Sequence, residues 1–210
     1  MNRLLGLAAL AVALVGCGGG TAAAHGQATL WVTRDRGAHV LLVRRVPAGL
    51  TAMQALDRVA DIETTYGGRY VQSIAGIDGS LSSQHDWFYF VNGIEADRCA
   101  AEYRLHAGDI EWWDYRSWAK RMQQPVVVGA FPEPFRHGTT VVNGSARIAG
   151  RLLNLIGSAG KSPRNVIELI PGRGFHAELK EQGVSATLGL QTARRLIRDP
   201  SAVRYRYEVP

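Results

Sequence analysis

Aromatic residues gather in two short segments whose pattern is unusual for a half-buried strand. Trp87–Val91 has an aromatic ring or Val at every position, and Ile110–Tyr115 has aromatic residues on both faces of an extended chain. A strand with one face on a core and the other in water normally alternates apolar and polar residues. Aromatic faces that remain exposed suit flat or ring-shaped ligands. The chemistry that these residues predict is therefore stacking against a ring.

Two interpretations of these segments remain open. In the first, the rings that face solvent form a ligand-binding surface with an arginine at its rim. The candidate binding residues are Trp87, Tyr89, Trp112, Trp113, Arg116 and Trp118. In the second, another part of the chain covers the rings, because large exposed apolar patches are uncommon without a partner. An open aromatic cleft would favour the first interpretation, and a closed, dry seam would favour the second.

Residues for catalysis or metal binding show no recognisable pattern. The six histidines stand singly, and none has the spacing of zinc ligands. Gly144-Ser145-Ala146 lacks the flanking glycines of a nucleophile elbow. We therefore expect a non-enzymatic protein with no catalytic residue, no metal and no cofactor. A hydrolase would require a histidine or carboxylate pair that converges only in space.

The N-terminal residues are typical of an export signal. Leu4–Val15 is an apolar run, shorter than the roughly 20 residues that span a bilayer but long enough for a signal-peptide core. It leads into Leu14-Val15-Gly16-Cys17, which resembles the bacterial lipobox. The resemblance implies cleavage before Cys17, which would then carry lipid; a plain secretion signal cut near Ala24 is the alternative. We expect a lipid-anchored protein at the extracytoplasmic face of the bacterial cell membrane.

The second cysteine, Cys99, would have no intramolecular partner once Cys17 carried lipid. A lone cysteine in an oxidising compartment can be a reactive nucleophile. It is more often a small buried hydrophobe, and the alanines beside Cys99 favour that interpretation.

Charge and tryptophan divide the chain of 210 residues into two units. All five tryptophans lie within the first 118 residues. Residues 17–124 hold 11 basic and 12 acidic side chains, a net charge of −1, whereas residues 125–210 hold 12 basic and 6 acidic, a net charge of +6. The predicted organisation is a signal peptide (1–16), a flexible tether (17–27), a first domain (28–122), a Pro-rich linker (123–138) and a small basic α/β domain (139–210).

The first domain has the element order of a β-grasp fold. Ala28–Thr33 and Ala38–Val46 predict a hairpin, and Thr51 can cap a helix that Tyr66-Gly67-Gly68 ends. Further strands are predicted at Tyr70–Ile77, Trp87–Val91 and Tyr103–Trp113. We therefore expect an α+β protein, with a β-grasp domain followed by the α/β domain.

The segment Trp87-Phe88-Tyr89-Phe90-Val91-Asn92-Gly93, followed by Tyr103, Leu105, Gly108-Asp109, Ile110 and Trp112, resembles the domain at the C-terminal end of transcobalamin. The resemblance covers roughly Ala28–Trp118. In transcobalamin this domain helps to enclose a corrinoid, so the resemblance implies a corrinoid or a similar small molecule as a possible ligand. A single domain of this kind offers one wall of such a site.

The sequence of the second domain predicts alternating strands and helices. The expected strands are Val126–Val128, Val141–Val142, Asn165–Ile170, Val184–Leu188 and Val203–Val209, and the expected helices are Ser145–Ile156, His176–Gln182 and Leu190–Ile197. Its arginines could face anionic lipid or form a solvated helix face. In the whole chain, 21 of the 24 basic residues are Arg, and a general compositional preference for Arg would also explain their number.

Taken together, these features predict a binding protein for uptake of a small molecule, with the membrane and a transporter or envelope protein as partners and no nucleic acid. An interaction or structural module without a small-molecule ligand is the alternative.

Overall fold

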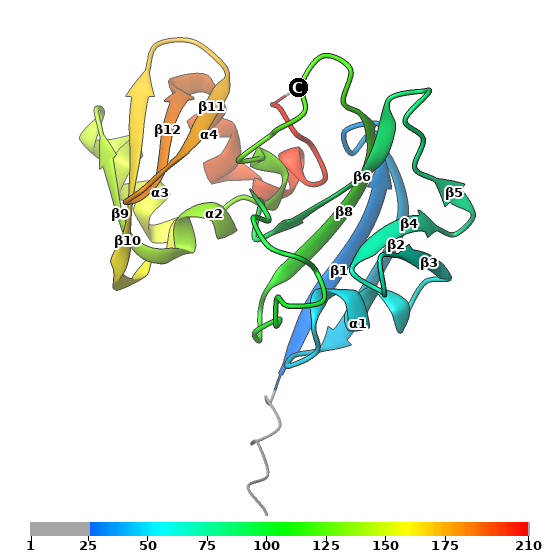
Figure 1. Ribbon diagram of the computed structural model, residues 1–210. Coiled ribbons are helices and arrows are strands. Elements are labelled where there is room, and N and C mark those ends of the chain that lie inside the picture. Colours follow the sequence, from blue (N-terminus) through cyan, green and yellow to red (C-terminus); the bar gives the residue numbers. More distant parts are fainter. Residues whose placement is uncertain (1–25, 210) are drawn as a thin grey trace, which may run out of the picture.

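The computed structural model describes residues 26–209, which form two β-rich units (Figure 1). Mixed sheets with few helices place the chain in the α+β class, as expected. The predicted signal peptide, Cys17 and most of the tether lie outside the described residues. Within residues 26–209 no helix has the length and apolar character needed to cross a bilayer.

The first unit is built on a five-stranded sheet with the strand order β2-β1-β8-β6-β7. The predicted hairpin is confirmed as β1 and β2, and β1 also pairs in parallel with β8. The other neighbours are antiparallel, and Asn92-Gly93, both at positive φ, make the tight turn between β6 and β7. The strands are β1 (Gln27–Arg34), β2 (His39–Pro47), β6 (His85–Val91), β7 (Ile94–Glu95) and β8 (Ile110–Ser117).

Helix α1 (Ala52–Asp57) packs across one face of this sheet, and its cap was predictable. The Thr51 side chain accepts a hydrogen bond from the Gln54 N–H, while the Gln54 side chain accepts one from the Thr51 N–H. The prediction that Tyr66-Gly67-Gly68 ends the helix was wrong, because α1 ends earlier and these residues form a hairpin turn.

That turn belongs to a small three-stranded sheet beside α1, with the order β3-β4-β5. The predicted strand Tyr70–Ile77 is broken at Ala75-Gly76, where both residues have positive φ. The predicted strand Tyr103–Trp113 begins only at Ile110. The strands are β3 (Ile62–Thr65), β4 (Tyr70–Ile74) and β5 (Ile77–Asp78).

The second unit is a four-stranded sheet with the order β11-β12-β10-β9 and two helices that pack on one of its faces. Strands β9, β10 and β12 are parallel, and β11 is antiparallel to β12. Gly157, at φ 57°, ends α3 as predicted. The elements are α2 (Glu133–Arg136), β9 (His137–Asn143), α3 (Ala146–Ile156), β10 (Ala159–Ile170), β11 (Phe175–Lys180), β12 (Gly183–Gly189) and α4 (Leu190–Arg198), with 3-10 turns η1 (Val128–Ala130) and η2 (Pro200–Val203).

Three predictions in this unit were wrong. The helix expected at His176–Gln182 is strand β11, whose Phe175, Ala177 and Leu179 recur with the period of two that a strand requires. The strand expected at Val126–Val128 contributes one bridge and then a 3-10 turn. The strand expected at Val203–Val209 is instead the end of η2 followed by irregular chain. Tyr205 and Tyr207 pack on the first unit, whereas Val203 and Val209 pack in the core of the second unit.

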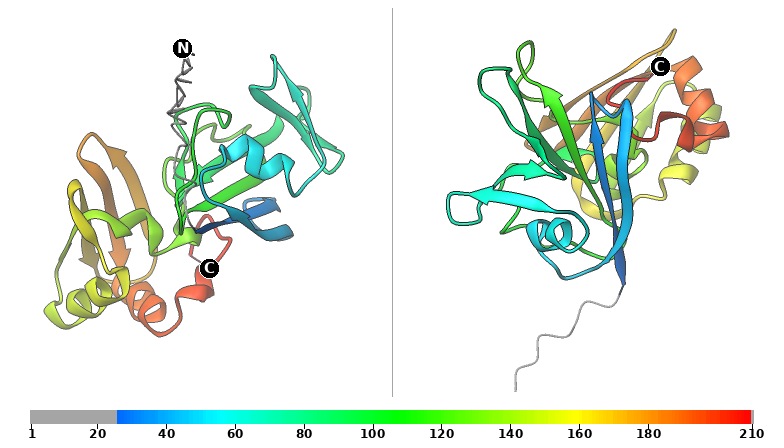
Figure 2. Two further views of the ribbon diagram at one scale, coloured as in Figure 1. Left: turned by 90° about the horizontal axis from the view of Figure 1, so that it is seen from below. Right: turned by 90° about the vertical axis from the view of Figure 1, so that its right-hand side faces the viewer.

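Both faces of the five-stranded sheet are covered. Leu30, Leu56 and Trp113 belong to the core between the sheet and α1. Phe90 and Trp112 belong to a second core on the opposite face. Figure 2 shows α1 and the C-terminal segment, coloured cyan and red, on opposite sides of the sheet.

Candidate functional site

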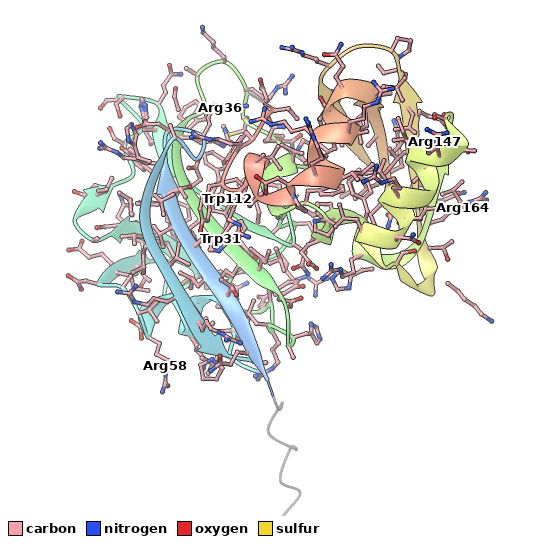
Figure 3. All side chains as sticks on the ribbon, turned by 180° about the vertical axis from the view of Figure 1, so that it is seen from behind. Trp31, Arg36, Arg58, Trp112, Arg147 and Arg164 are labelled. Carbon is pink, nitrogen blue, oxygen red and sulfur yellow. The ribbon has the colours of Figure 1, made fainter. Side chains whose placement is uncertain are left out.

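The C-terminal segment 204–209 closes the sheet face that is turned away from α1. The ring centroids of Tyr205 and Trp31 are 4.6 Å apart, and those of Tyr207 and Trp112 are 5.4 Å apart, both in the edge-to-face geometry that aromatic pairs favour. Trp31 and Trp112, which lie side by side in Figure 3, are 5% and 0% exposed. This face is therefore a closed seam between the sheet and the end of the chain.

Two glycines leave room for the C-terminal segment. A Cβ atom on Gly37 would lie 1.4 Å from the carbonyl oxygen of Tyr205, and one on Gly129 would lie 2.6 Å from the backbone nitrogen of Arg206. Gly37 also has a φ of 78°, which L side chains rarely adopt. Any larger residue at either position would push the segment away from the sheet.

The predicted binding residues do not form one surface. Trp112 is buried in the seam, whereas Trp87 and Trp113 point toward α1 and are 6% and 4% exposed. Arg116 is not at a rim but fully buried: its guanidinium lies 3.6 Å above the Phe88 ring and donates to the carbonyl oxygens of residues 121 and 122. Trp112, Trp113 and Arg116 therefore present no group to solvent, because residues far away in the chain cover them.

Three of the predicted residues do meet at one place. Trp87, Tyr89 and Trp118 line a hollow of about 660 Å³ at the edge of β6, which we call the aromatic hollow. Its other lining residues come from strands β4, β6 and β7, from loops, from the linker and from β11 of the second unit. They are Tyr70, Leu81, Asp86, Phe88, Glu95, Ala96, Asp97, Met122, Gln123, Pro125 and Leu179.

The apolar residues of the aromatic hollow are unusually exposed. Leu81 is 82% exposed, Met122 53% and Leu179 49%. With Tyr70, these residues are four of the nine large hydrophobic side chains that stand exposed among residues 26–209. Such concentration in one hollow is the property that distinguishes a binding surface from scattered apolar residues.

Strand β6 is unpaired where it borders the aromatic hollow. Strand β7 pairs only with Phe90 and Val91, and an isolated bridge joins His85 to Ser80. Between these two points, no strand among residues 26–209 pairs with the outer side of β6, although the Ala96 N–H donates to the Tyr89 carbonyl oxygen and the Trp87 N–H donates to the Asp86 carboxylate. A ligand in the aromatic hollow would thus contact both side chains and the edge of a strand.

Two tyrosines set the polar character of the aromatic hollow. The Tyr70 hydroxyl donates to the Asp86 carboxylate, and the Tyr89 hydroxyl donates to the carbonyl oxygen of Arg98. Burial raises the pKa of both tyrosines, and for Tyr70 the hydrogen bond to Asp86 raises the pKa further. Both hydroxyls therefore remain protonated, and the ring of Tyr89 is fixed by stacking on Trp113 at 4.9 Å.

A neighbouring hollow of about 500 Å³ brings two histidines together, which the sequence did not indicate. It is lined by His106 and His137 with Asp109, whose carboxylate lies 3.4 Å from the His106 Nδ1. The Asn92 amide lies 2.8 Å from Asp109 and 3.2 Å from the His137 Nε2. The lining contains no Ser, Thr or Cys to act as a nucleophile. These residues therefore form a chain of polar contacts that joins the two units, and they do not form a catalytic triad.

Other candidates from the sequence have ordinary surroundings. Cys99 is partly exposed rather than buried, and its Sγ lies 3.0 Å from the carbonyl oxygen of Arg69. No group of three or more His, Cys, Asp or Glu side chains in residues 26–209 is arranged to hold a metal ion. His25 lies outside the described residues.

Most of the residues that line the aromatic hollow were not predicted from the sequence. Leu81, Met122 and Leu179 are single apolar residues in loops or at a strand that had been predicted as helix. They are separated by up to 98 positions in the sequence and converge only in the folded chain. What identifies these residues as part of a candidate site is their exposure in the folded chain, which the sequence did not indicate.

Comparisons with known proteins match the first unit. Residues 49–117 match a domain family of unknown function, DUF4430. A crystal structure from Ruminococcus gnavus ATCC 29149, of a protein to which metal binding has been attributed, aligns with 44% of this chain and 97% of its own at 16% identity and a TM-score of 0.36. Haptocorrin in complex with Cbi aligns with 44% of this chain at 14% identity and a TM-score of 0.38. This chain covers only 25% of the haptocorrin chain. No curated protein matches the chain.

Proposed function

We propose that the protein is a non-enzymatic binding protein that takes a small molecule with a flat apolar part in the aromatic hollow. The observation that carries this proposal is the gathering of Tyr70, Leu81, Met122 and Leu179, all exposed, around one unpaired strand edge. Their burial by a ligand would be favourable by about 25 cal/mol per Å² of apolar surface. The volume of about 660 Å³ lies within the range of sites for small molecules, about 300–1,000 Å³.

The ligand class follows from the lining. Trp118 and Phe88 offer ring surfaces. Asp86 already accepts from the Tyr70 hydroxyl and the Trp87 N–H, and Glu95 from Arg116 and the Gln124 N–H, so the more exposed carboxylate of Asp97 is the one at the margin that a ligand could reach. This combination favours a ligand with an apolar ring system and peripheral hydrogen-bond donors or positive charge. A corrinoid, which the resemblance to transcobalamin implied, is one such molecule and is the first probe that we would use.

The proposal includes the fold name and the location. We propose a β-grasp domain because β1 and β8 are parallel neighbours at the centre of the sheet and α1 crosses one face. We propose anchoring at the extracytoplasmic face of the membrane because the sequence reaches Cys17 through a signal-like apolar run. A transporter or envelope protein would then receive the ligand.

Equilibrium titration of the full chain with a corrinoid, haem and short glycans tests the proposal. We expect one of these probes to bind saturably, and Trp118→Ala to weaken its binding at least about tenfold by removing an indole from the lining. Tyr66→Ala is the matched control, because Tyr66 is an aromatic residue, is 82% exposed and does not line the hollow. Equal weakening by both variants, or no saturable binding of any probe, would reject the proposal.

The second candidate is an interaction module without a small-molecule ligand, and the seam favours it. Tyr207, Phe90 and Trp112 show that much of the aromatic content of the chain joins its own parts. In that case the exposed residues of the aromatic hollow would contact another protein. A complex whose formation protects Leu81 and Met122 from solvent, with no small-molecule binding, would support this candidate.

A further inference from the structure

Four arginines of the second unit border one hollow on its helical face. The hollow has a volume of about 660 Å³ and lies between α3 and α4. Arg147 and Arg151 come from α3, and Arg194 and Arg198 come from α4. No acidic side chain is among the lining residues. We call these four residues the arginine cluster.

The arginine cluster differs from the ion-paired arginines of residues 26–209. Arg44, Arg45, Arg58 and Arg104 also have no ion pair in this part of the chain, but they do not share this hollow. Six other arginines have a carboxylate oxygen within 3.6 Å: Arg34, Arg36, Arg69, Arg98, Arg116 and Arg136. None of the four cluster residues has an ion pair with any residue in 26–209, and all four are exposed. Their positive charge is therefore left without a counter-charge from the described chain.

The spacing of the cluster opposes folding. Arg147 and Arg151 are four residues apart on one helix, and Arg194 and Arg198 repeat this spacing on the helix that packs beside it. Like charges at this spacing repel each other and destabilise a helix. Arg147 also lies in the first turn of α3, where the helix dipole disfavours a cation. An external anion would relieve this repulsion.

We propose that the arginine cluster binds the phosphate groups of anionic phospholipids, so that α3 and α4 lie against the membrane surface. Guanidinium groups bind phosphate oxygens through paired, charge-assisted hydrogen bonds. Ser145 and Gln191 add neutral hydrogen-bonding groups, and Ile148 and Ile197 add apolar surface suited to a phosphate ester. The choice of a membrane as the phosphate source rests on the proposed location of the chain, whereas the phosphate chemistry rests on the cluster alone.

Vesicle flotation with the full chain tests this inference. Wild-type protein is mixed with vesicles of phosphatidylcholine alone or with added phosphatidylglycerol. We expect tighter binding to the anionic vesicles, with the preference falling as salt screens the charges. Replacing all four cluster arginines by Gln should weaken binding to anionic vesicles about 1,000-fold, since each basic residue near such a surface contributes about 1 kcal/mol.

A matched variant removes the same charge from another part of the surface. Arg44, Arg45, Arg58 and Arg104 are exposed arginines of the first unit, and Arg58 lies far from Arg147 in Figure 3. Replacing these four by Gln should leave the preference for anionic vesicles within about threefold of wild type. Equal losses in the two variants would overturn the inference, because they would reflect net charge rather than a site.

Two further measurements separate the remaining outcomes. If millimolar inorganic phosphate abolishes vesicle binding, the cluster binds free phosphate, and the proposal that it binds the phosphate groups of membrane lipids is overturned. Thermal unfolding should show the cluster variant at least as stable as wild type, because like-charge repulsion has been removed. The affinities of the same variants for corrinoid, haem and glycans should match those of wild type. The titrations therefore test ligand binding in the aromatic hollow, and vesicle flotation tests lipid binding by the arginine cluster, independently of each other.

Discussion

The two faces of the five-stranded sheet are covered, whereas its edge at β6 is accessible. On the faces, Trp31, Trp112 and Trp113 are sealed by α1 or by the C-terminal segment. At the edge of β6, Trp118 and Leu81 remain accessible beside an unpaired strand. Aromatic composition is similar in both regions. The difference shows that it is the position of covering elements, not the presence of rings, that separates a core from a possible binding surface.

The largest expected effect comes from breaking the sealed face. Trp112→Ala should lower the free energy of unfolding by about 3–5 kcal/mol, the usual cost of removing a buried aromatic side chain. It would also remove the contacts of the Trp112 ring with Tyr207 and Phe90, and it would leave the Thr33 hydroxyl without its hydrogen bond from the Trp112 indole. Urea denaturation followed by circular dichroism measures this change. A loss below about 1 kcal/mol would mean that the seam contributes little to the fold.

A second prediction concerns Glu111, which is buried on the face that α1 covers. Burial raises the pKa of this carboxyl to about 8, and the hydrogen bond from the Trp113 indole lowers it only in part. The carboxyl is therefore protonated in the folded chain at neutral pH and ionised in the unfolded chain. Its contribution to stability is complete below pH 4.5 and is lost as the pH rises toward 8.

Glu111→Gln should remove this pH dependence. Gln keeps the acceptor for the Trp113 indole but does not ionise, so the variant should gain stability relative to wild type as the pH increases. The gain should approach about 4 kcal/mol near pH 8.5 and be close to zero near pH 4.5, from about 1.4 kcal/mol for each pH unit. Denaturation curves at the two pH values measure it. A gain that is the same at both would contradict the burial of the ionisable group.

The smallest effect on stability is expected at the edge. Trp118→Ala and Leu81→Ala each remove a side chain that the rest of the chain leaves accessible, so we expect losses of about 1 kcal/mol or less. The same urea denaturation used for Trp112→Ala provides the comparison. If Trp118→Ala destabilises the fold as much as Trp112→Ala does, the edge is part of the core and the contrast with the faces disappears.

Local patterns in the sequence were sufficient for much of the fold. The capping box at Thr51, the Asn92-Gly93 turn and Gly157 at the end of α3 each act within a few residues, and each occurs where expected. The tail after η2 could not be predicted in this way. Its valine and tyrosine residues have strand composition, but the partners of Tyr205 and Tyr207 are tryptophans more than 90 positions away.

The candidate site was predicted only in part, for the same reason. Trp87, Tyr89 and Trp118 do line one hollow, whereas Trp112, Trp113 and Arg116 do not. Alternation along β8 places Trp112 and Trp113 on opposite faces, and both faces acquire a cover that the strand itself does not reveal. Which residues are accessible is therefore decided by α1 on one face and by the C-terminal segment on the other.

Tyr205 and Tyr207 complete the core of the unit where the chain begins, passing over Gly37 and Gly129 to reach it. Residues that lie about 170 positions apart in the sequence therefore share one core. Without Tyr205 and Tyr207, Trp31 and Trp112 would lose the rings that cover them on this face of the sheet. The two units are thus joined by shared packing and not only by the linker.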